Sequence, residues 1–294
     1  MPLAELVARA NAVRRARCGA AVHTCTIMSA KSGRCGEDCK FCAQAARHAT
    51  GVETYALKSV PEILSAARRA HAIGSAHFGI VTSGNRLTAA EIARVADAIA
   101  EITRTLPITV CASLGALAAA DLRRLKQAGL TRYHHNIETS RAFYPRIVST
   151  HSFADRIATI RAARRAGLEV CSGGIIGLGE SWDDRIAMAG TLRDLKVDAV
   201  PINVLVPIKH TPLAGLPPLP CADVIRTIAI FRLLLPGTVI KLAAGRETIL
   251  KDFQAMAFMA GANGMIVGGY LTVQGRSVEE DQRFISELQQ LLTG

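Results

Sequence analysis

Aromatic residues are scarce in this sequence: Phe, Tyr and Trp together make up 4% of the 294 residues, and there is one Trp. Proteins that bind single-stranded nucleic acid stack bases on aromatic rings interleaved with basic residues. Acidic residues are outnumbered, since 24 Asp and Glu stand against 35 Lys and Arg for a formal net charge of +11. The basic residues are scattered as pairs such as Arg68-Arg69 and Arg123-Arg124, so we expect the charge to attract small anions and not nucleic acid.

No run of apolar residues approaches the 18 or so that a membrane-spanning helix needs. Residues 1–20 read as an amphipathic helix with arginines on one side, without the apolar core and cleavage site of a signal peptide. The chain has eight cysteines, and in the reducing cytosol cysteines serve as metal ligands before they form disulfides. We therefore expect a cytoplasmic protein that binds metal and has no membrane partner.

Three of the cysteines lie within residues 31–42, KSGRCGEDCKFC, at C-x₃-C-x₂-C spacing. A structural zinc site or a ferredoxin cluster takes four protein ligands, and no fourth Cys or His follows at a usable spacing. On a [4Fe–4S] cluster, Cys35, Cys39 and Cys42 would leave one iron open to chelate S-adenosylmethionine (SAM) and reduce its sulfonium, which releases a 5′-deoxyadenosyl radical. We interpret the loop as a radical-SAM loop; the alternative is a zinc loop or a cluster of reduced, buried thiols.

Apolar, β-branched segments alternate with helical segments along the whole chain. The length fits one α/β barrel of roughly 250 residues, and we find no linker that would divide it. The predicted fold is an α/β, single (β/α)₈ TIM-type barrel of residues 1–294, with an N-terminal helix 1–20, a barrel 23–273 and a C-terminal helix 277–292. The expected strands are 23–29, 76–82, 108–113, 132–138, 168–176, 199–206, 239–244 and 264–269. The expected helices between them are 61–73, 88–105, 119–128, 152–166, one from Trp182 and 222–235.

In such a barrel the functional groups gather at the carboxyl ends of the strands. The cysteine loop follows the first expected strand, and Cys25, Cys111 and Cys171 lie on the first, third and fifth. A single strand cysteine usually acts as a small buried hydrophobe, but three on separate strands favour a shared site. Cys18 precedes Cys25 by seven residues and is a weaker candidate.

Seven segments together resemble the biotin synthase family of the radical-SAM superfamily, in the family's order from about residue 23 to residue 273. They are KSGRCGEDCKFCAQAARH, VCASLG, YHHNIETS, VCSGGIIGLGE, VPINVLVPIKHTPL, LAAGRE and AFMAGANGMIVGGY. The cysteine loop identifies the superfamily, whereas HHNIETS and INVLVPIKHTPL are specific to biotin synthase and near relatives.

The resemblance implies roles for several residues around SAM and the substrate. Asn136 and Glu138 match positions that meet substrate and the SAM ribose, although the family often has Asp in place of Glu138. Arg156 matches an arginine near the SAM carboxylate, and Asn203 resembles a substrate-binding asparagine. Gly173 and Gly174 begin a glycine-rich run that we expect to let backbone approach SAM. The alternative for both asparagines is a buried amide satisfied by the protein itself.

Members of this family commonly hold a second, auxiliary [2Fe–2S] cluster on three cysteines and an arginine. The resemblance assigns Cys111, Cys171 and Arg246 to three of these ligands. The fourth belongs on the second strand, where this chain has Gly79 in the segment HFGI, and glycine offers no ligand.

Cys25 lies on the neighbouring strand, where many relatives have serine, and could supply the missing thiolate. With Cys18 as a fourth ligand, the site could hold a four-iron auxiliary cluster in place of [2Fe–2S]. The alternative is that the auxiliary cluster is lost.

The family activity is radical-SAM sulfur insertion, which converts dethiobiotin to biotin with sulfur from the auxiliary cluster. Its implied partners are dethiobiotin, SAM and a reducing electron donor such as flavodoxin or ferredoxin, and a homodimer is possible. Two alternatives remain open: a related radical-SAM maturase or mutase with another small substrate, and a non-enzymatic iron–sulfur carrier.

Overall fold

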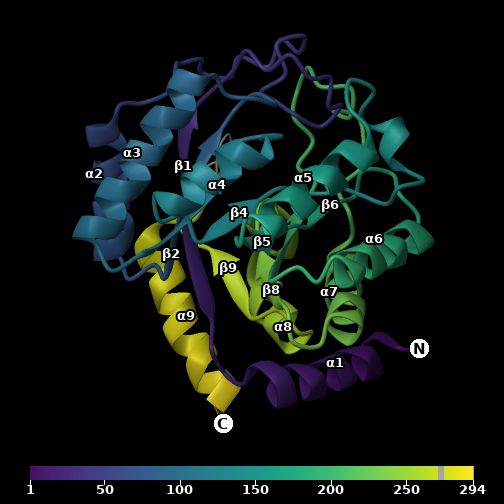
Figure 1. Ribbon diagram of the computed structural model, residues 1–294. Helices are drawn as coiled ribbons and strands as arrows, with labels where there is room; N and C mark the ends of the chain where they lie inside the picture. The colour runs from purple at the N-terminus through teal and green to yellow at the C-terminus, as the bar shows by residue number, and fades with distance from the viewer. Residues whose placement is uncertain (271–274, 294) are drawn as a thin grey trace.

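The computed structural model describes residues 1–270 and 275–293, in which parallel strands close into a barrel surrounded by helices (Figure 1). The strand order is β5-β4-β3-β2-β1-β9-β8-β7-β6, and a further β5–β7 pairing closes the ring. The predicted TIM-type barrel is therefore confirmed. The strands are β1 His23–Lys31, β2 His77–Thr82, β3 Thr109–Ser113, β4 Arg132–His134, β5 Glu169–Cys171, β6 Gly174–Ile176, β7 Ala199–Val204, β8 Val239–Leu242 and β9 Gly264–Ile266.

Two expected strands differ from the structure. The segment expected at 168–176 is divided into β5 and β6 at Ser172 and Gly173. Gly173 lies close to the neighbouring strand, where a Cβ atom would collide with the carbonyl oxygen of Pro201. The segment expected at 132–138 is extended only as far as His134. The residues that follow form a loop at the carboxyl end of β4, which is where a barrel carries its functional groups.

The helices begin and end close to the predicted residues because their caps are local sequence features. Thr88, Ser152 and Ser181 each accept a hydrogen bond from the backbone three residues later, and an acidic side chain at that position bonds back to the cap. The short helix α8 was not predicted. The helices are α1 Leu3–Cys18, α2 Val60–Ala72, α3 Ala89–Thr105, α4 Ala119–Gln127, α5 Phe153–Arg165, α6 Trp182–Asp194, α7 Cys221–Leu234, α8 Gln254–Met259 and α9 Val278–Thr293.

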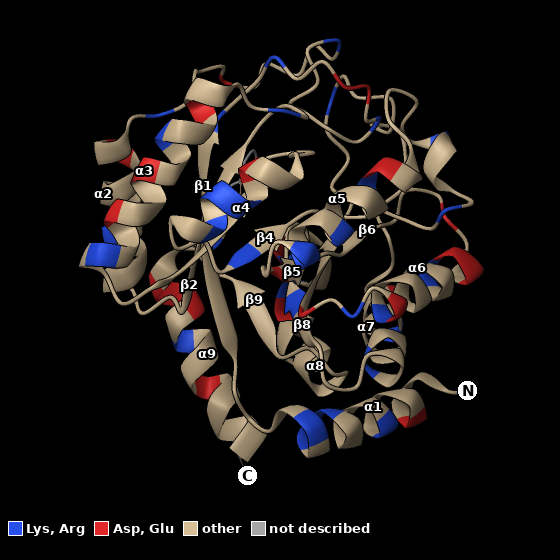
Figure 2. Ribbon diagram, viewed as in Figure 1, with Lys and Arg blue, Asp and Glu red and all other residues tan. Residues whose placement is uncertain are grey.

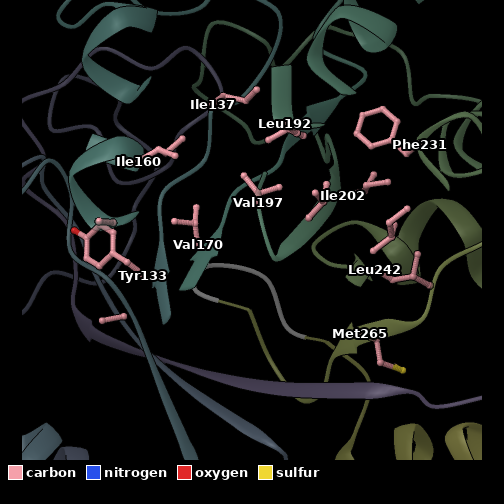
Figure 3. Close-up of a cluster of buried hydrophobic side chains, with 14 of the residues drawn as sticks. Tyr133, Ile137, Ile160, Val170, Leu192, Val197, Ile202, Phe231, Leu242 and Met265 are labelled. Atoms are coloured by element: carbon pink, nitrogen blue, oxygen red, sulfur yellow. The ribbon is translucent and has the colours of Figure 1, made fainter. Parts of the chain in front are cut away.

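Strand alternation separates the core from the interior of the barrel. In Figure 3, apolar strand residues lie close to apolar side chains from helices α5, α6 and α7. The buried strand residues are Tyr133, Val170, Ile202, Leu242 and Met265. Because successive strand side chains point to opposite faces, the sequence neighbours of these five residues face the barrel interior. Polar and thiol groups therefore enter the interior while the outer core stays apolar.

The amino end of the barrel is held by a buried arginine. Both termini and α1 lie at this end (Figure 1), and Arg232 of α7 is fully buried there. Its guanidinium donates to the backbone oxygens of Gly261, Leu235, Pro236 and Thr238 and to the side chain of Asn263, at 2.8–3.0 Å. Gly261 makes room for the arginine, since a Cβ atom there would overlap the Arg232 stem.

Charged residues of both signs alternate along the outer helices (Figure 2). No helix among residues 1–270 and 275–293 is long and apolar enough to cross a membrane.

Replacing Arg232 with methionine tests whether this cation fixes the amino end. The change keeps most of the buried volume but leaves several buried oxygens without donors, so we expect a loss of about 2–4 kcal/mol in the free energy of unfolding. Urea unfolding followed by circular dichroism measures it. The control is Arg9→Met on the exposed side of α1, where the side chain is 61% exposed and we expect a change within about 0.5 kcal/mol. Equal losses for the two variants would contradict the role of Arg232.

Candidate functional site

A cavity of about 400 Å³ occupies the barrel interior and opens at the carboxyl ends of the strands. Six of the eight cysteines line it. They form two groups: the loop group comprises Cys35, Cys39 and Cys42 from the segment after β1, and the strand group comprises Cys25, Cys111 and Cys171 from β1, β3 and β5.

The cysteine loop is held by hydrogen bonds within the loop and by hydrogen bonds to a segment distant in the sequence. The backbone N–H of Cys35 donates to Gln44 at 3.0 Å, and that of Cys42 donates to the carbonyl of Cys39 at 3.0 Å. Asp38 accepts hydrogen bonds from the backbone and hydroxyl groups of Ser149 and Thr150. Although burial opposes it, this set of donors lowers the pKa of Asp38 well below its usual value. The loop is therefore held against the segment that precedes α5.

The loop thiols fit a cationic cluster. Burial, together with the neighbouring Cys42 sulfur, raises the pKa of the Cys39 thiol, and burial raises that of Cys42 to about 11. Both would keep their protons at neutral pH unless positive charge lay among them, and iron supplies such charge to soft thiolate ligands. No three His, Cys, Asp or Glu side chains of the described residues are placed to hold a single metal ion. A four-iron cluster differs from such a site, because each thiolate binds a separate iron.

Beside the loop group lies a buried pair of opposite charges. Arg156 of α5 is 3.7 Å from Glu138, and both side chains line the cavity. Burial raises the pKa of Glu138, while the Arg156 charge opposes that shift. Glu138 has a left-handed backbone, with φ of 66°, and the amide of Asn136 lies 3.4 Å from its carboxylate. A cation and a hydrogen-bonding carboxylate thus face the cavity next to the three thiols.

The two predicted asparagines line the cavity, but their amides are also engaged by backbone. Asn136 accepts from the N–H of Gly173 at 3.0 Å. Asn203 donates to the carbonyl of Gly174 at 3.1 Å and accepts from the N–H of Ala244 at 3.2 Å. Each amide therefore ties neighbouring segments together and keeps only part of its hydrogen-bonding capacity for a ligand.

Gly173 and Gly174, which the sequence leads us to expect beside SAM, are not among the residues that line the cavity. A Cβ atom at Gly173 would collide with the carbonyl of Pro201, and one at Gly174 would collide with the carbonyl of Glu138. Both glycines therefore permit close packing within the protein. Gly174 helps to place Glu138, because the Ile175 N–H donates to the Glu138 carbonyl at 2.8 Å.

The strand group lies on β1, β3 and β5. In the register of β2 and β3, Gly79 is the partner of Cys111, so the missing second-strand ligand would stand directly beside Cys111. Gly79 also pairs with Ile27 of β1, and Cys25 lies two residues before Ile27. Cys25 therefore enters the same interior from the adjacent strand, displaced by one inward-facing position along the barrel.

Two cations face the strand group. Burial raises the pKa of each of its three thiols, and the charges of Lys241 and Arg132 act in the opposite direction. Arg132 is bound to Glu169 at 2.6 Å, and its Nη1 is buried without a partner among the described residues. Lys241 is 3% exposed and lines the cavity. Burying Lys241 is costly without nearby negative charge, and Arg132 keeps one N–H group without a partner in the described part of the chain beside its contact with Glu169, so the group suits an anionic, thiolate-bound ligand.

Arg246 and Cys18 are the predicted ligands that the structure does not bring to the cavity. Arg246 is 1% exposed and its guanidinium contacts Asp281 at 2.7 and 2.8 Å, Gln254 at 2.5 Å and the Tyr270 hydroxyl at 2.8 Å. Cys18 ends α1 at the amino end of the barrel, with its sulfur 3.7 Å from the Pro236 carbonyl. Arg246 therefore donates most of its N–H groups to protein acceptors, and Cys18 lies at the amino end of the barrel.

Lys241, Arg132 and His151 also line the cavity but were not predicted from the sequence. Lys241 and Arg132 could have been found, because each is a charged residue inside a segment predicted to be a buried strand. His151 carried no such signal, because it lies in a polar stretch before a helix.

Comparison with known proteins agrees with this geometry. A family model described as "Radical SAM superfamily" matches residues 30–192, and one described as "Biotin and Thiamin Synthesis associated domain" matches residues 201–290. Among solved structures, methylornithine synthase has a TM-score of 0.83 at 19% identity, covering 97% of this chain and 88% of that one. The [FeFe]-hydrogenase maturase HydG from Carboxydothermus hydrogenoformans has a TM-score of 0.83 at 18% identity, covering 97% and 70%. These two likenesses show the fold alone.

Sequence relatives define the family more narrowly. A protein named biotin synthase from Thermotoga neapolitana is 52% identical over 269 residues, which cover 91% of this chain and 96% of the relative. Another from Thermotoga petrophila is 50% identical over 293 residues, which cover 99% and 97%. With six cysteines facing one barrel interior and relatives this similar along nearly the whole chain, the protein belongs to the biotin synthase family of radical-SAM enzymes.

Proposed function

We propose that this protein converts dethiobiotin to biotin by radical sulfur insertion, with the loop group as the SAM-cleaving site and the strand group as the sulfur-donor site. The observation that carries the proposal is the presence of two groups of three cysteines in one cavity. The Arg156–Glu138 pair lies beside the loop group, and two cations lie beside the strand group. A passive iron–sulfur carrier would need one group and no enclosed cavity.

In the first site, Cys35, Cys39 and Cys42 would hold the [4Fe–4S] cluster, which when bound supplies the electron that cleaves SAM. Arg156 is the cation available to bind the SAM carboxylate, and Glu138 can accept hydrogen bonds from ribose hydroxyls. The left-handed backbone at Glu138 and the close packing at Gly174 hold that carboxylate at the cavity wall. These residues orient SAM and restrict its motion, which lowers the entropic part of the barrier.

In the second site, Cys25, Cys111 and Cys171 would hold an auxiliary iron–sulfur cluster of two or four irons, which when bound supplies the sulfur. Lys241 and Arg132 would balance the negative charge of its thiolates. Dethiobiotin would lie between the two sites, where the free N–H of Asn203 can bind it. The interior of the barrel would limit the access of water to the reacting carbon.

The exposed rim of the cysteine loop suits an acidic electron carrier such as flavodoxin or ferredoxin. Arg34, Lys40 and Arg47 are exposed there, and complementary charge speeds association between proteins. A homodimer remains a prediction from the family.

Replacing Cys39 with alanine tests the first site. The cluster would lose one of three thiolates, so we expect reductive formation of 5′-deoxyadenosine from SAM to fall to background in anaerobically reconstituted protein. Chromatography of the nucleoside measures it. The matched control is Cys221→Ala, because Cys221 begins α7 outside the cavity and its loss should leave the product level unchanged. Undiminished 5′-deoxyadenosine from the Cys39 variant would rule out the assigned site.

Replacing Cys25 with serine tests the second site. Serine nearly preserves the volume but exchanges a soft thiolate for a hard hydroxyl, so we expect loss of auxiliary iron and of biotin formation while SAM cleavage persists. Iron and sulfide analysis with a biotin assay measures both. A Cys18→Ser variant is the control, since that sulfur lies outside the cavity and iron content should stay at the unsubstituted level. If Cys25 is only a packed residue, both variants will retain full iron and biotin yield, with at most about 1–3 kcal/mol of stability lost.

A further inference from the structure

A chain of polar contacts leads from Arg156 to the cysteine loop. Arg156 Nε lies 3.1 Å from the Tyr144 hydroxyl, that hydroxyl lies 2.7 Å from His151 Nδ1, and His151 Nε2 lies 3.8 Å from Cys39 Sγ. Tyr144 is 1% exposed and the His151 side chain 8% exposed. SAM binding, as proposed above, uses Arg156 but gives no part to Tyr144 or His151.

The donors and acceptors along this chain favour one arrangement of its protons. A guanidinium can only donate, so Arg156 Nε–H donates to the Tyr144 oxygen. The single hydroxyl proton of Tyr144 is then free to donate to His151 Nδ1. A neutral imidazole that accepts at Nδ1 carries its proton at Nε2. The His151 Nε2–H is therefore available to donate to the Cys39 sulfur.

One competing acceptor lies near the His151 ring, and the surrounding contacts hold the chain in position. The other acceptor near Nε2 is the carboxylate of Glu37, whose Oε2 lies 3.7 Å away and beyond normal hydrogen-bonding distance. Asp38 binds Ser149 and Thr150, so the cysteine loop and the segment carrying His151 are attached to each other. Tyr144 is in turn packed edge-on against Phe153, with ring centroids 5.6 Å apart. Donor and acceptor are thus held in place before any cluster binds.

A hydrogen bond to a ligating sulfur stabilises the more negative state of an iron–sulfur cluster, because reduction adds negative charge that the sulfurs share. We propose that His151 is a positioning residue that donates to Cys39 and raises the reduction potential of the SAM-cleaving cluster, with Tyr144 fixing the histidine tautomer. The inference rests on the proposed function only in taking Cys39 as a cluster ligand. The buried charge of Arg156 polarises Tyr144 and strengthens the same chain.

Replacing His151 with phenylalanine removes the N–H and keeps a ring of similar size. The measurement is an electron paramagnetic resonance titration of the reduced [4Fe–4S] signal in the reconstituted full-length protein. We expect the midpoint potential to become more negative, so that the ratio of reduced to oxidised cluster at a fixed potential falls roughly fivefold. His151→Gln, which keeps a side-chain N–H donor, should recover part of the shift. Iron content should match the unsubstituted protein in both variants.

A second variant keeps the proposal testable if His151→Phe binds too little iron. Tyr144→Phe leaves the histidine in place but no longer fixes its tautomer, so we expect a smaller shift in the same direction. A midpoint potential unchanged in whichever of these variants retains the cluster would overturn the role of His151 and leave the proposed function intact. A cluster whose assembly is unaffected by Cys39→Ala would instead show that the proposed ligand set is wrong.

Discussion

A thiol buried away from water keeps its proton unless positive charge lies beside it, and this constraint governs the barrel interior. Burial raises the pKa of the cysteines of the strand group and of Cys39 and Cys42 in the loop group. Burying the basic side chains inside the barrel also costs free energy, since a buried cation needs nearby negative charge. Thiolate-bound iron–sulfur clusters would satisfy both requirements. The unusual composition of the interior is therefore consistent with two such sites.

The amino end of the barrel carries contacts that stabilise the fold, and the carboxyl end carries the candidate site. At the amino end, Arg232 binds backbone oxygens where β8 and β9 begin, with no role in the cavity. Arg246 has a supporting role near the cavity, because its bond to Asp281 attaches α9 and its bond to the Tyr270 hydroxyl fixes a side chain that lines the cavity. The first family match ends in α6 and the second begins in β7, and the strands of both belong to one closed sheet. We propose that residues 1–294 therefore fold as one unit.

The fold could be predicted because its signals are local: apolar segments recur between helices whose caps are visible in sequence, such as Thr88 followed by Glu91. The loop group could be predicted for the same reason, since three close cysteines need no tertiary information. The sequence did not indicate that Lys241 faces the cavity while Arg246, five residues later, does not. Lys241 lies within β8, whereas Arg246 follows Gly245, whose left-handed backbone precedes a helical turn at Arg246–Leu250. The role of Gly173 and Gly174 could not be predicted for a related reason, because a close approach of the backbone to protein and one to a ligand demand the same residue.

Iron analysis of the Cys111→Ala, Cys171→Ala double variant tests most directly whether one interior holds two independent cluster sites. Mössbauer spectroscopy of the anaerobically reconstituted protein, with and without the substitutions, separates the two populations of iron. We expect the double variant to retain the [4Fe–4S] signal and SAM cleavage while losing the second iron population and all biotin formation. A double variant with the full iron content and biotin yield of the unsubstituted protein would contradict the two-site arrangement.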